Sequence, residues 1–288
     1  MKVIKEIKAM QEISEFLRRT GKKIGFVPTM GFLHEGHVEL MIAAKDECDT
    51  VIASIFVNPA QFLPGEDFRT YPRDFTRDYF ICEKAGVDYL FYPEASDVYP
   101  EGYKTYVNVN DISDIYEGKY RLGHFTGVAT IVLKLFNMTK PHSAYFGQKD
   151  AQQVIVIKKM TTDLNMDVEI KVCPTLREDN GLAKSSRNTY LSDEQKEDAA
   201  VLNEALNLGK NIILEGSFED YKGVKMAMKE HIETKTPECS LQYIAITDNT
   251  RMEKITDLKS YEGDVLISLA AFFGKTRLID NILFTKKN

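Results

Sequence analysis

The 288-residue sequence predicts an α/β protein in which helices wind around a parallel sheet, with a smaller α+β domain after it. Three observations lead to this fold class. Short apolar runs of strand length alternate with amphipathic helical segments as far as residue 172, as in βαβ units. The alternation then stops, and helices are followed by a run of strands. The length itself suggests roughly two domains of about 150 residues.

The first half of the chain is expected to open with an amphipathic helix, because apolar residues recur at helical spacing from Ile4 to Leu17 before Gly21. Buried strands are indicated by short apolar runs, and helices by apolar positions of helical period. The expected strands are 23–28, 51–57, 87–92, 144–146 and 168–172, and the further helices start near 37 and span 73–85, 126–138 and 150–164. This order indicates a Rossmann-like sheet, which binds ligands outside the carboxyl ends of its strands.

The second half changes character after Thr189. Ser192 is a good N-cap and acidic residues follow it, so a long amphipathic helix is expected there. A second helix is expected at 221–233, and strands at 241–246, 265–269 and 278–284. The predicted domains are therefore residues 1–175 and residues 176–288.

Composition and charge exclude several classes of protein. The chain has 37 basic and 43 acidic residues, a net charge of −6, and no basic patch that would indicate nucleic-acid binding. The longest uncharged run, residues 50–65, contains two prolines and is shorter than the roughly 20 apolar residues of a membrane span. The N-terminus lacks the apolar stretch of a secretory signal, so a cytoplasmic protein is expected.

The segment Pro28–His37 lies where the first strand of the sheet leads into a helix. Such a helix N-terminus offers unpaired backbone N–H groups, which suit a phosphate. Gly31 and Gly36 allow a ligand to approach the backbone. His34 and His37 are three residues apart and can converge on one side of the turn, where imidazoles can donate hydrogen bonds to phosphate oxygens.

Two familiar motifs do not fit this segment. A Walker A loop has lysine where His37 stands and serine or threonine where Val38 stands. A zinc protease motif needs histidines four residues apart, whereas these are three apart. The remaining alternative is a glycine turn with two surface histidines.

Two more polar segments carry candidate phosphate ligands. Phe146–Gln153 follows a predicted strand and holds Lys149, Asp150 and Gln153 near the start of a helix, where they could also be a solvated pair that caps it. Asp179–Asn188 is a polar loop with a glycine, two serines and two cations. It could grip a triphosphate, or be an ordinary surface turn.

Weaker polar clusters occur around Asn58–Phe62, around Tyr71–Arg73 and around Arg121–Phe125. On the helix after Arg73, Asp78 could be a Mg²⁺ ligand. The alternative is a solvated carboxylate, because Arg77 is next to it.

Taken together, these segments resemble the pantoate beta-alanine ligases of the nucleotidyltransferase superfamily, and the resemblance covers nearly the whole chain. It rests on Val27-Pro-Thr-Met-Gly31 with His34-x-Gly-His37, Ser54-Ile-Phe-Val-Asn-Pro59 with Gln61-Phe62, Gly123-His-Phe125, Phe146-Gly with Lys149-Asp150 and Gln152-Gln153, Asp179-x-Gly-Leu-Ala183 with Ser185-Ser-Arg-Asn188, and Arg277-Leu-Ile-Asp-Asn281. Lys184 departs from the family's pattern, in which an apolar residue is frequent, and Arg77 stands where some relatives have a second acid.

The resemblance implies that (R)-pantoate and ATP form pantoyl adenylate and diphosphate, and that β-alanine then displaces AMP to give pantothenate. Mg²⁺, a homodimer and a C-terminal lid are implied in the same way. The implied catalytic residues are His34, His37, Lys149, Ser186 and Arg187, and Gln61 and Gln153 would hold pantoate. The implied ATP-binding residues are Met30, Gly31, Phe32, Leu33, His34, Glu35, Gly36, His37, Gly147, Gln148, Lys149, Asp150, Leu176, Lys184, Ser185, Ser186 and Arg187.

Three alternatives share some of these features. A nucleotidyltransferase that joins AMP to a phosphate ester would have the two-histidine turn but would not need Gln61 and Gln153. A tRNA synthetase would need an anticodon-binding domain, and none is evident in the sequence. A regulatory module that only senses nucleotides would not need Lys149 together with both histidines.

Overall fold

The structure is a computed structural model that describes residues 1–218 and 220–287. These residues form two compact units. The first consists of Met1–Gly147 and Val156–Pro174, and the second of Gln148–Ile155 and the chain from Thr175 onward. The boundary near residue 175 stays a prediction. The second unit also includes the turn after residue 147, which the sequence placed in the N-terminal domain.

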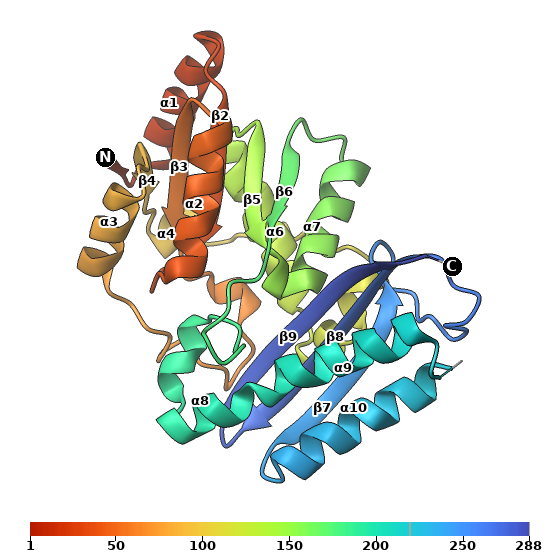
Figure 1. Cartoon of the computed structure of the whole chain (residues 1–288). Helices are drawn as coiled ribbons and strands as arrows, with labels where there is room; N and C mark the ends of the chain where they lie inside the picture. Colours follow the sequence, from red (N-terminus) through yellow and green to blue (C-terminus); the bar gives the residue numbers. More distant parts are fainter. Residues whose placement is uncertain (219, 288) are drawn as a thin grey trace. The chain divides into compact units, whose positions relative to one another are not determined.

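The first unit contains the expected parallel sheet, wound with helices (Figure 1). Its strand order is β1-β4-β3-β2-β5-β6, and every neighbouring pair is parallel. The strands are β1 (Lys2–Ile4), β2 (Ile24–Thr29), β3 (Thr50–Ile55), β4 (Tyr89–Phe91), β5 (Ser143–Gly147) and β6 (Glu169–Cys173). The longer helices are α1 (Ile7–Arg19), α2 (Glu35–Glu47), α3 (Phe75–Lys84), α6 (His124–Thr139) and α7 (Ala151–Asp163), the last of which runs from one unit into the other.

Side-chain alternation along β2 places helices on both faces of this sheet. Val27 packs with Met41 and Ala44 of α2 in one core. Phe26, which points the other way, contacts Phe136 of α6 with ring centroids 6.3 Å apart. α2 follows the loop at the carboxyl end of β2, and that loop carries part of the candidate site.

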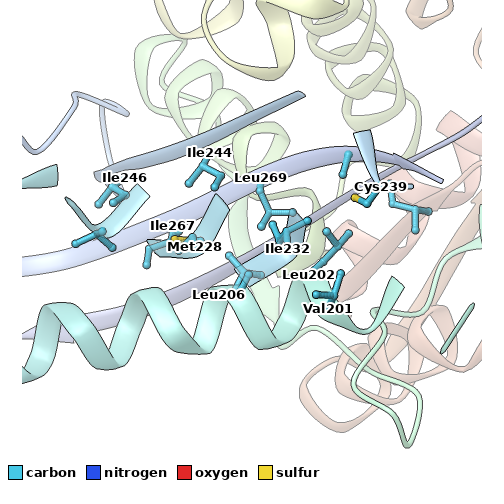
Figure 2. Packing of buried hydrophobic residues seen from close by; sticks show 14 of the residues in the cluster. Val201, Leu202, Leu206, Met228, Ile232, Cys239, Ile244, Ile246, Ile267 and Leu269 are labelled. Carbon is cyan, nitrogen blue, oxygen red and sulfur yellow. The ribbon is translucent and has the colours of Figure 1, made fainter. Parts of the chain in front are cut away.

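The second unit has three antiparallel strands in the order β7-β8-β9, packed against two helices (Figure 1). The elements are η4 (Ser186–Tyr190), α8 (Asp193–Ala199), α9 (Val201–Glu215), α10 (Tyr221–Lys235), β7 (Ser240–Asp248), β8 (Gly263–Phe273) and β9 (Thr276–Lys286). Leu206 of α9 and Met228 of α10 meet Ile267 of β8 in a continuous apolar core (Figure 2). The smaller α+β part expected from the sequence is thus present.

Some elements differ from the sequence expectation. The chain opens with strand β1, not with a helix, because Lys2–Ile4 pairs with Tyr89–Phe91 of β4. The long helix expected after Ser192 is two helices, α8 and α9, which meet at Ala200. The sequence did not predict six short elements: η1 (Pro59–Gln61), α4 (Ala95–Val98), η2 (Ile112–Asp114), α5 (Glu117–Tyr120), η3 (Gln148–Asp150) and η4, which begins in the expected polar loop. Across the described residues, every helix is too short or too polar to traverse a bilayer.

Candidate active site

The loop after β2 is held in an unusual backbone conformation by Asp78 of α3. Gly31 has φ +83° and Phe32 has φ +50°, a left-handed value that is uncommon outside glycine. The Asp78 carboxylate accepts hydrogen bonds from the N–H groups of Phe32 (2.7 Å) and Leu33 (2.8 Å). Burial raises the pKa of Asp78 above its ordinary value, although these two bonds act in the opposite direction. Asp78 therefore fixes the loop that leads into α2.

His34 and His37 form an imidazole cap at the N-terminus of α2. The Nδ1 atom of His34 accepts the N–H of Gly36 at 3.1 Å, and Nδ1 of His37 accepts the N–H of His34 at 3.2 Å. The ring centroids are 4.1 Å apart, as the three-residue spacing predicts. Because Nδ1 is an acceptor in both rings, each neutral imidazole carries its proton on Nε2. The pair can thus offer two N–H donors to an oxyanion beside the start of α2.

Gln61 lies in η1, after the carboxyl end of β3, and its side chain is fixed by neighbouring polar groups. Asn58 donates from Nδ2 to Oε1 of Gln61 at 2.9 Å and to the carbonyl of Gly127 at 3.1 Å. Tyr99 donates its hydroxyl proton to Oδ1 of Asn58 at 2.8 Å. The Asn58-Pro pair gave a weak sequence signal for this turn, whereas no sequence pattern pointed to Tyr99.

The backbone of Gln61 is held by a buried histidine and an ion-paired arginine. The Gln61 carbonyl lies 2.8 Å from Nδ1 of His124, and Nη1 of Arg121 lies 3.1 Å from Nε2 of the same ring. Arginine can only donate, so Nε2 is the acceptor and Nδ1–H donates to the carbonyl. Arg121 also bonds both carboxylate oxygens of Glu66, at 2.7 and 2.8 Å. Burial, with a smaller contribution from the Arg121 charge, lowers the pKa of His124 to about 4.

In the second unit, Lys149 lies in the short turn η3. Its Nζ is 3.8 Å from Oδ1 of Asp150, and its side chain is 20% exposed. Gln153 follows in the first turn of α7. The backbone of η3 is bound by Asn281 of β9, whose side chain donates to the carbonyls of Gln148 and Lys149.

The second polar loop of this unit is folded back on itself. The N–H of Lys184 donates to the carbonyl of Leu176 at 2.9 Å, and Nζ of Lys184 lies 2.9 Å from Oε2 of Glu178. The hydroxyl of Ser185 accepts the N–H of Arg187 and begins η4. Lys184 thus has an ion-pairing role inside the loop.

The structure distributes the predicted site residues between the two units. The first unit brings Met30–His37, Gln61, Asp78 and Gly147 to the carboxyl ends of β2, β3 and β5 or the helices after them. The second unit holds Gln148, Lys149, Asp150, Gln153, Leu176, Lys184, Ser185, Ser186 and Arg187. The role of each residue stays a prediction at this point.

The chain is similar to known proteins over nearly its whole length. The family model for pantoate-beta-alanine ligase matches residues 2–283. Curated pantothenate synthetases from Caldicellulosiruptor bescii and Acetivibrio thermocellus are 54% identical over 287 residues and 48% identical over 283 residues. These alignments cover 100% of both chains for the first relative, and 98% of this chain and 99% of the other for the second.

Solved structures show the same similarity. A pantothenate synthetase from Thermus thermophilus has a TM-score of 0.89 at 40% identity, covering 98% of this chain and 99% of that one. A pantoate-beta-alanine ligase from Francisella tularensis, complexed with beta-gamma ATP and beta-alanine, has a TM-score of 0.79 at 39% identity, covering 98% of this chain and 97% of that one.

Proposed function

The chain belongs to the pantoate-beta-alanine ligase family, and from this premise we propose how its residues carry out the reaction. It is an ATP-dependent ligase that joins pantoate to β-alanine to form pantothenate. The main observation behind the proposed residue roles is the pair of imidazoles at the start of α2. In both rings, Nδ1 accepts a hydrogen bond from a backbone N–H group. The reaction would proceed through pantoyl adenylate.

In the first step, the carboxylate of (R)-pantoate attacks the α-phosphorus of ATP and diphosphate leaves. Attack of one anion on another requires alignment and charge neutralisation more than a strong base. His34 and His37 would donate from Nε2 to phosphate oxygens, and the N-terminus of α2 would add its partial positive charge. Lys149, Ser186 and Arg187 are the other proposed phosphate ligands.

In the second step, the β-alanine amine attacks the acyl carbon of the adenylate and AMP leaves. The pantoyl group has hydroxyls and a carbonyl, which carboxamides can bind as donors and acceptors. Gln61 and Gln153 are the proposed ligands. The fixed side chain of Gln61 supports this role, because a pre-positioned amide loses little entropy on binding.

The remaining proposed ATP contacts are those of the nucleoside and of the phosphate loop. These contacts are proposed from the resemblance to the family. This set comprises Met30, Gly31, Phe32, Leu33, Glu35, Gly36, Gly147, Gln148, Asp150, Leu176, Lys184 and Ser185.

We propose that Mg²⁺ enters with ATP and is held mainly by phosphate oxygens, whose charge it neutralises. Within the described parts of the chain, no three His, Cys, Asp or Glu side chains gather into a cation site. Both carboxylate oxygens of Asp78 already accept hydrogen bonds from backbone N–H groups. The oxygen ligands available there therefore do not match a resident magnesium site. A homodimer in the cytoplasm is proposed on family grounds, and sedimentation velocity would test the dimer.

Isotope exchange between ATP and diphosphate tests the proposed first step. Exchange is expected to require pantoate but not β-alanine. Exchange without pantoate would contradict a pantoyl-adenylate intermediate. Exchange that requires a phosphate ester in place of pantoate would favour the other nucleotidyltransferase.

The imidazole roles can be tested in the same assay. The His37→Ala variant is expected to lose exchange by about 100-fold, because a phosphate donor is removed at the reacting centre. His231→Ala is the control, because His231 pairs with Glu204 of α9 and is not among the predicted site residues. Near-normal exchange in His37→Ala with unchanged thermal melting would refute the role of His37.

A further inference from the structure

The side chain of Asn281 uses its amide group to bind the turn that carries Lys149. Nδ2 donates to the carbonyl oxygens of Gln148, at 2.9 Å, and of Lys149, at 2.8 Å. Oδ1 accepts a hydrogen bond from Nε2 of Gln148 at 3.1 Å. Asn281 is 4% exposed, so these bonds are made away from solvent. Both amide hydrogens are therefore committed to the backbone of η3.

The preceding residue of β9 binds the other candidate phosphate loop. Asp280 receives two hydrogen bonds from Arg177, at 2.6 and 3.0 Å, in a bidentate arrangement. Arg177 also donates to the carbonyl of Gly181 at 3.0 Å. Arg177 and Gly181 belong to the loop that leads to Lys184–Arg187, so Asp280 ties this loop to the strand.

The two attachments come from one dipeptide of an edge strand. Consecutive side chains of a strand project to opposite sides, which lets Asp280 and Asn281 serve different segments. The N–H of Asn281 also donates to Oδ1 of Asp280 at 2.8 Å, which couples the two contacts. Both segments are far from this strand along the chain. The hydrogen bonds from Asp280 and Asn281 therefore help to place both segments within the unit, in addition to the turn preferences of the segments themselves.

We propose that Asn281 is a positioning residue that places Lys149 for phosphate binding by holding the carbonyls of Gln148 and Lys149. The proposal rests on the phosphate-binding role proposed for Lys149. Reaction rates depend steeply on such placement, because a shift of about 1 Å in a positioned group can cost about 100-fold. Asn281 contributes through the backbone of η3 and not through contact with the substrate.

A double-mutant cycle tests this proposal in the intact enzyme. Lys149→Ala is expected to slow ATP–diphosphate exchange by about 100-fold, and Asn281→Ala by at least about tenfold. If Asn281 acts through Lys149, the double variant should be within about threefold of Lys149→Ala alone. Transfer of the pantoyl group from preformed adenylate to β-alanine should change less than exchange does, because no diphosphate is present in that step.

A matched control is Thr285→Val on the same strand. Thr285 donates to Asp264 at 2.7 Å and has no part in the binding of η3, so exchange should stay at the wild-type rate. The outcomes separate the two proposals. Near-normal exchange in Lys149→Ala would refute the role of Lys149 and the positioning role with it. A severe Lys149→Ala defect, with a normal Asn281→Ala rate or multiplicative losses in the double variant, would overturn the positioning role alone.

Hydrogen exchange keeps the proposal testable if Asn281→Ala folds poorly. In Asn281→Ser, the amides of 148–151 should exchange faster while those of β7 and β8 stay protected. Equal acceleration throughout the second unit would show that Asn281 supports the sheet and would overturn its specific action on η3.

Discussion

Asp78 accepts the N–H groups of Phe32 and Leu33 in the loop that leads into α2, and these two hydrogen bonds predict the effect of its substitution. In Asp78→Asn, one carboxylate oxygen becomes an NH₂ group that faces a backbone N–H. One charge-assisted hydrogen bond is lost, so unfolding should become easier by about 2 kcal/mol. Adenylate formation should fall, because Phe32 would no longer be held at φ +50°. Chemical unfolding and ATP–diphosphate exchange measure the two effects.

The same variant separates loop positioning from magnesium binding. If Asp78 positions the loop, the Mg²⁺ concentration for half-maximal exchange should not change in Asp78→Asn. Asp74→Asn is the control, because Asp74 caps the same helix and asparagine caps equally well. A raised Mg²⁺ requirement in Asp78→Asn alone would restore the ligand role that the sequence suggested.

His124 makes stability depend on pH. Its pKa is about 4 in the folded protein, against about 6.5 in an unfolded chain. Between these values the unfolded state binds the additional proton, so the free energy of unfolding should fall as pH decreases from about 6.5 to about 4. The loss from this group would approach about 3 kcal/mol at the acid end.

Urea unfolding at several pH values would measure this contribution. His124→Asn keeps a donor near the carbonyl of Gln61 but does not titrate, so its stability should fall less between about pH 6.5 and about pH 4. Equal pH dependence of the two proteins would contradict a neutral, buried imidazole.

At the level of elements, Gly127 lets α6 approach η1. A Cβ atom at this position would lie 2.2 Å from the carbonyl oxygen of Ala60 and 2.7 Å from Cα of Gln61. Gly127→Ala must therefore displace η1, at a cost of about 1–3 kcal/mol in stability. Because η1 carries Gln61, KM for pantoate should rise more than KM for ATP.

Steady-state kinetics with each substrate varied would check this expectation. Asn137→Ala, at an exposed position of α6, is the control and should leave both KM values unchanged. An unchanged KM for pantoate in Gly127→Ala would show that η1 tolerates the shift or that Gln61 does not bind pantoate.

Elements with their own periodic pattern could be predicted from the sequence, and those fixed by distant partners could not. The buried run at β3 and the helical spacing of α1 are local signals. In contrast, β1 is three residues long and forms only because β4 pairs with it. The same limit applies to the site. The spacing of His34 and His37 predicts their convergence, but no local pattern links Asn281 to η3 or Asp78 to Phe32.

At the scale of the whole molecule, an enzyme with net charge −6 must bind two anionic substrates. Two cations near the candidate site residues are paired with carboxylates: Arg121 with Glu66, and Lys184 with Glu178. Backbone dipoles and imidazole N–H groups, as at the start of α2, would therefore add to the field that Lys149 and Arg187 supply for phosphate.

The two compact units have separate apolar cores, and this organisation predicts how the molecule responds to a core defect. Ile267 is fully buried among α9, α10 and the three-stranded sheet, and Leu90 is fully buried in the core beneath α2. Truncating either to alanine should cost about 2–5 kcal/mol, because buried methyl groups are lost and a cavity is left. If each unit opens on its own, the cost stays in the unit that holds the cavity.

Hydrogen exchange read by mass spectrometry can follow both units in one sample, and the two variants serve as controls for each other. Ile267→Ala should accelerate exchange in β7 and β8 and leave β2 and β3 at wild-type rates. Leu90→Ala should do the reverse, because β4 pairs with β3 in the parallel sheet. Saturating ATP should slow both accelerated rates if both units bind the nucleotide, since a ligand stabilises whatever must be folded to bind it. Equal acceleration of both sheets by either variant would instead establish one cooperative unit, and the division near residue 175 would then describe topology and not stability.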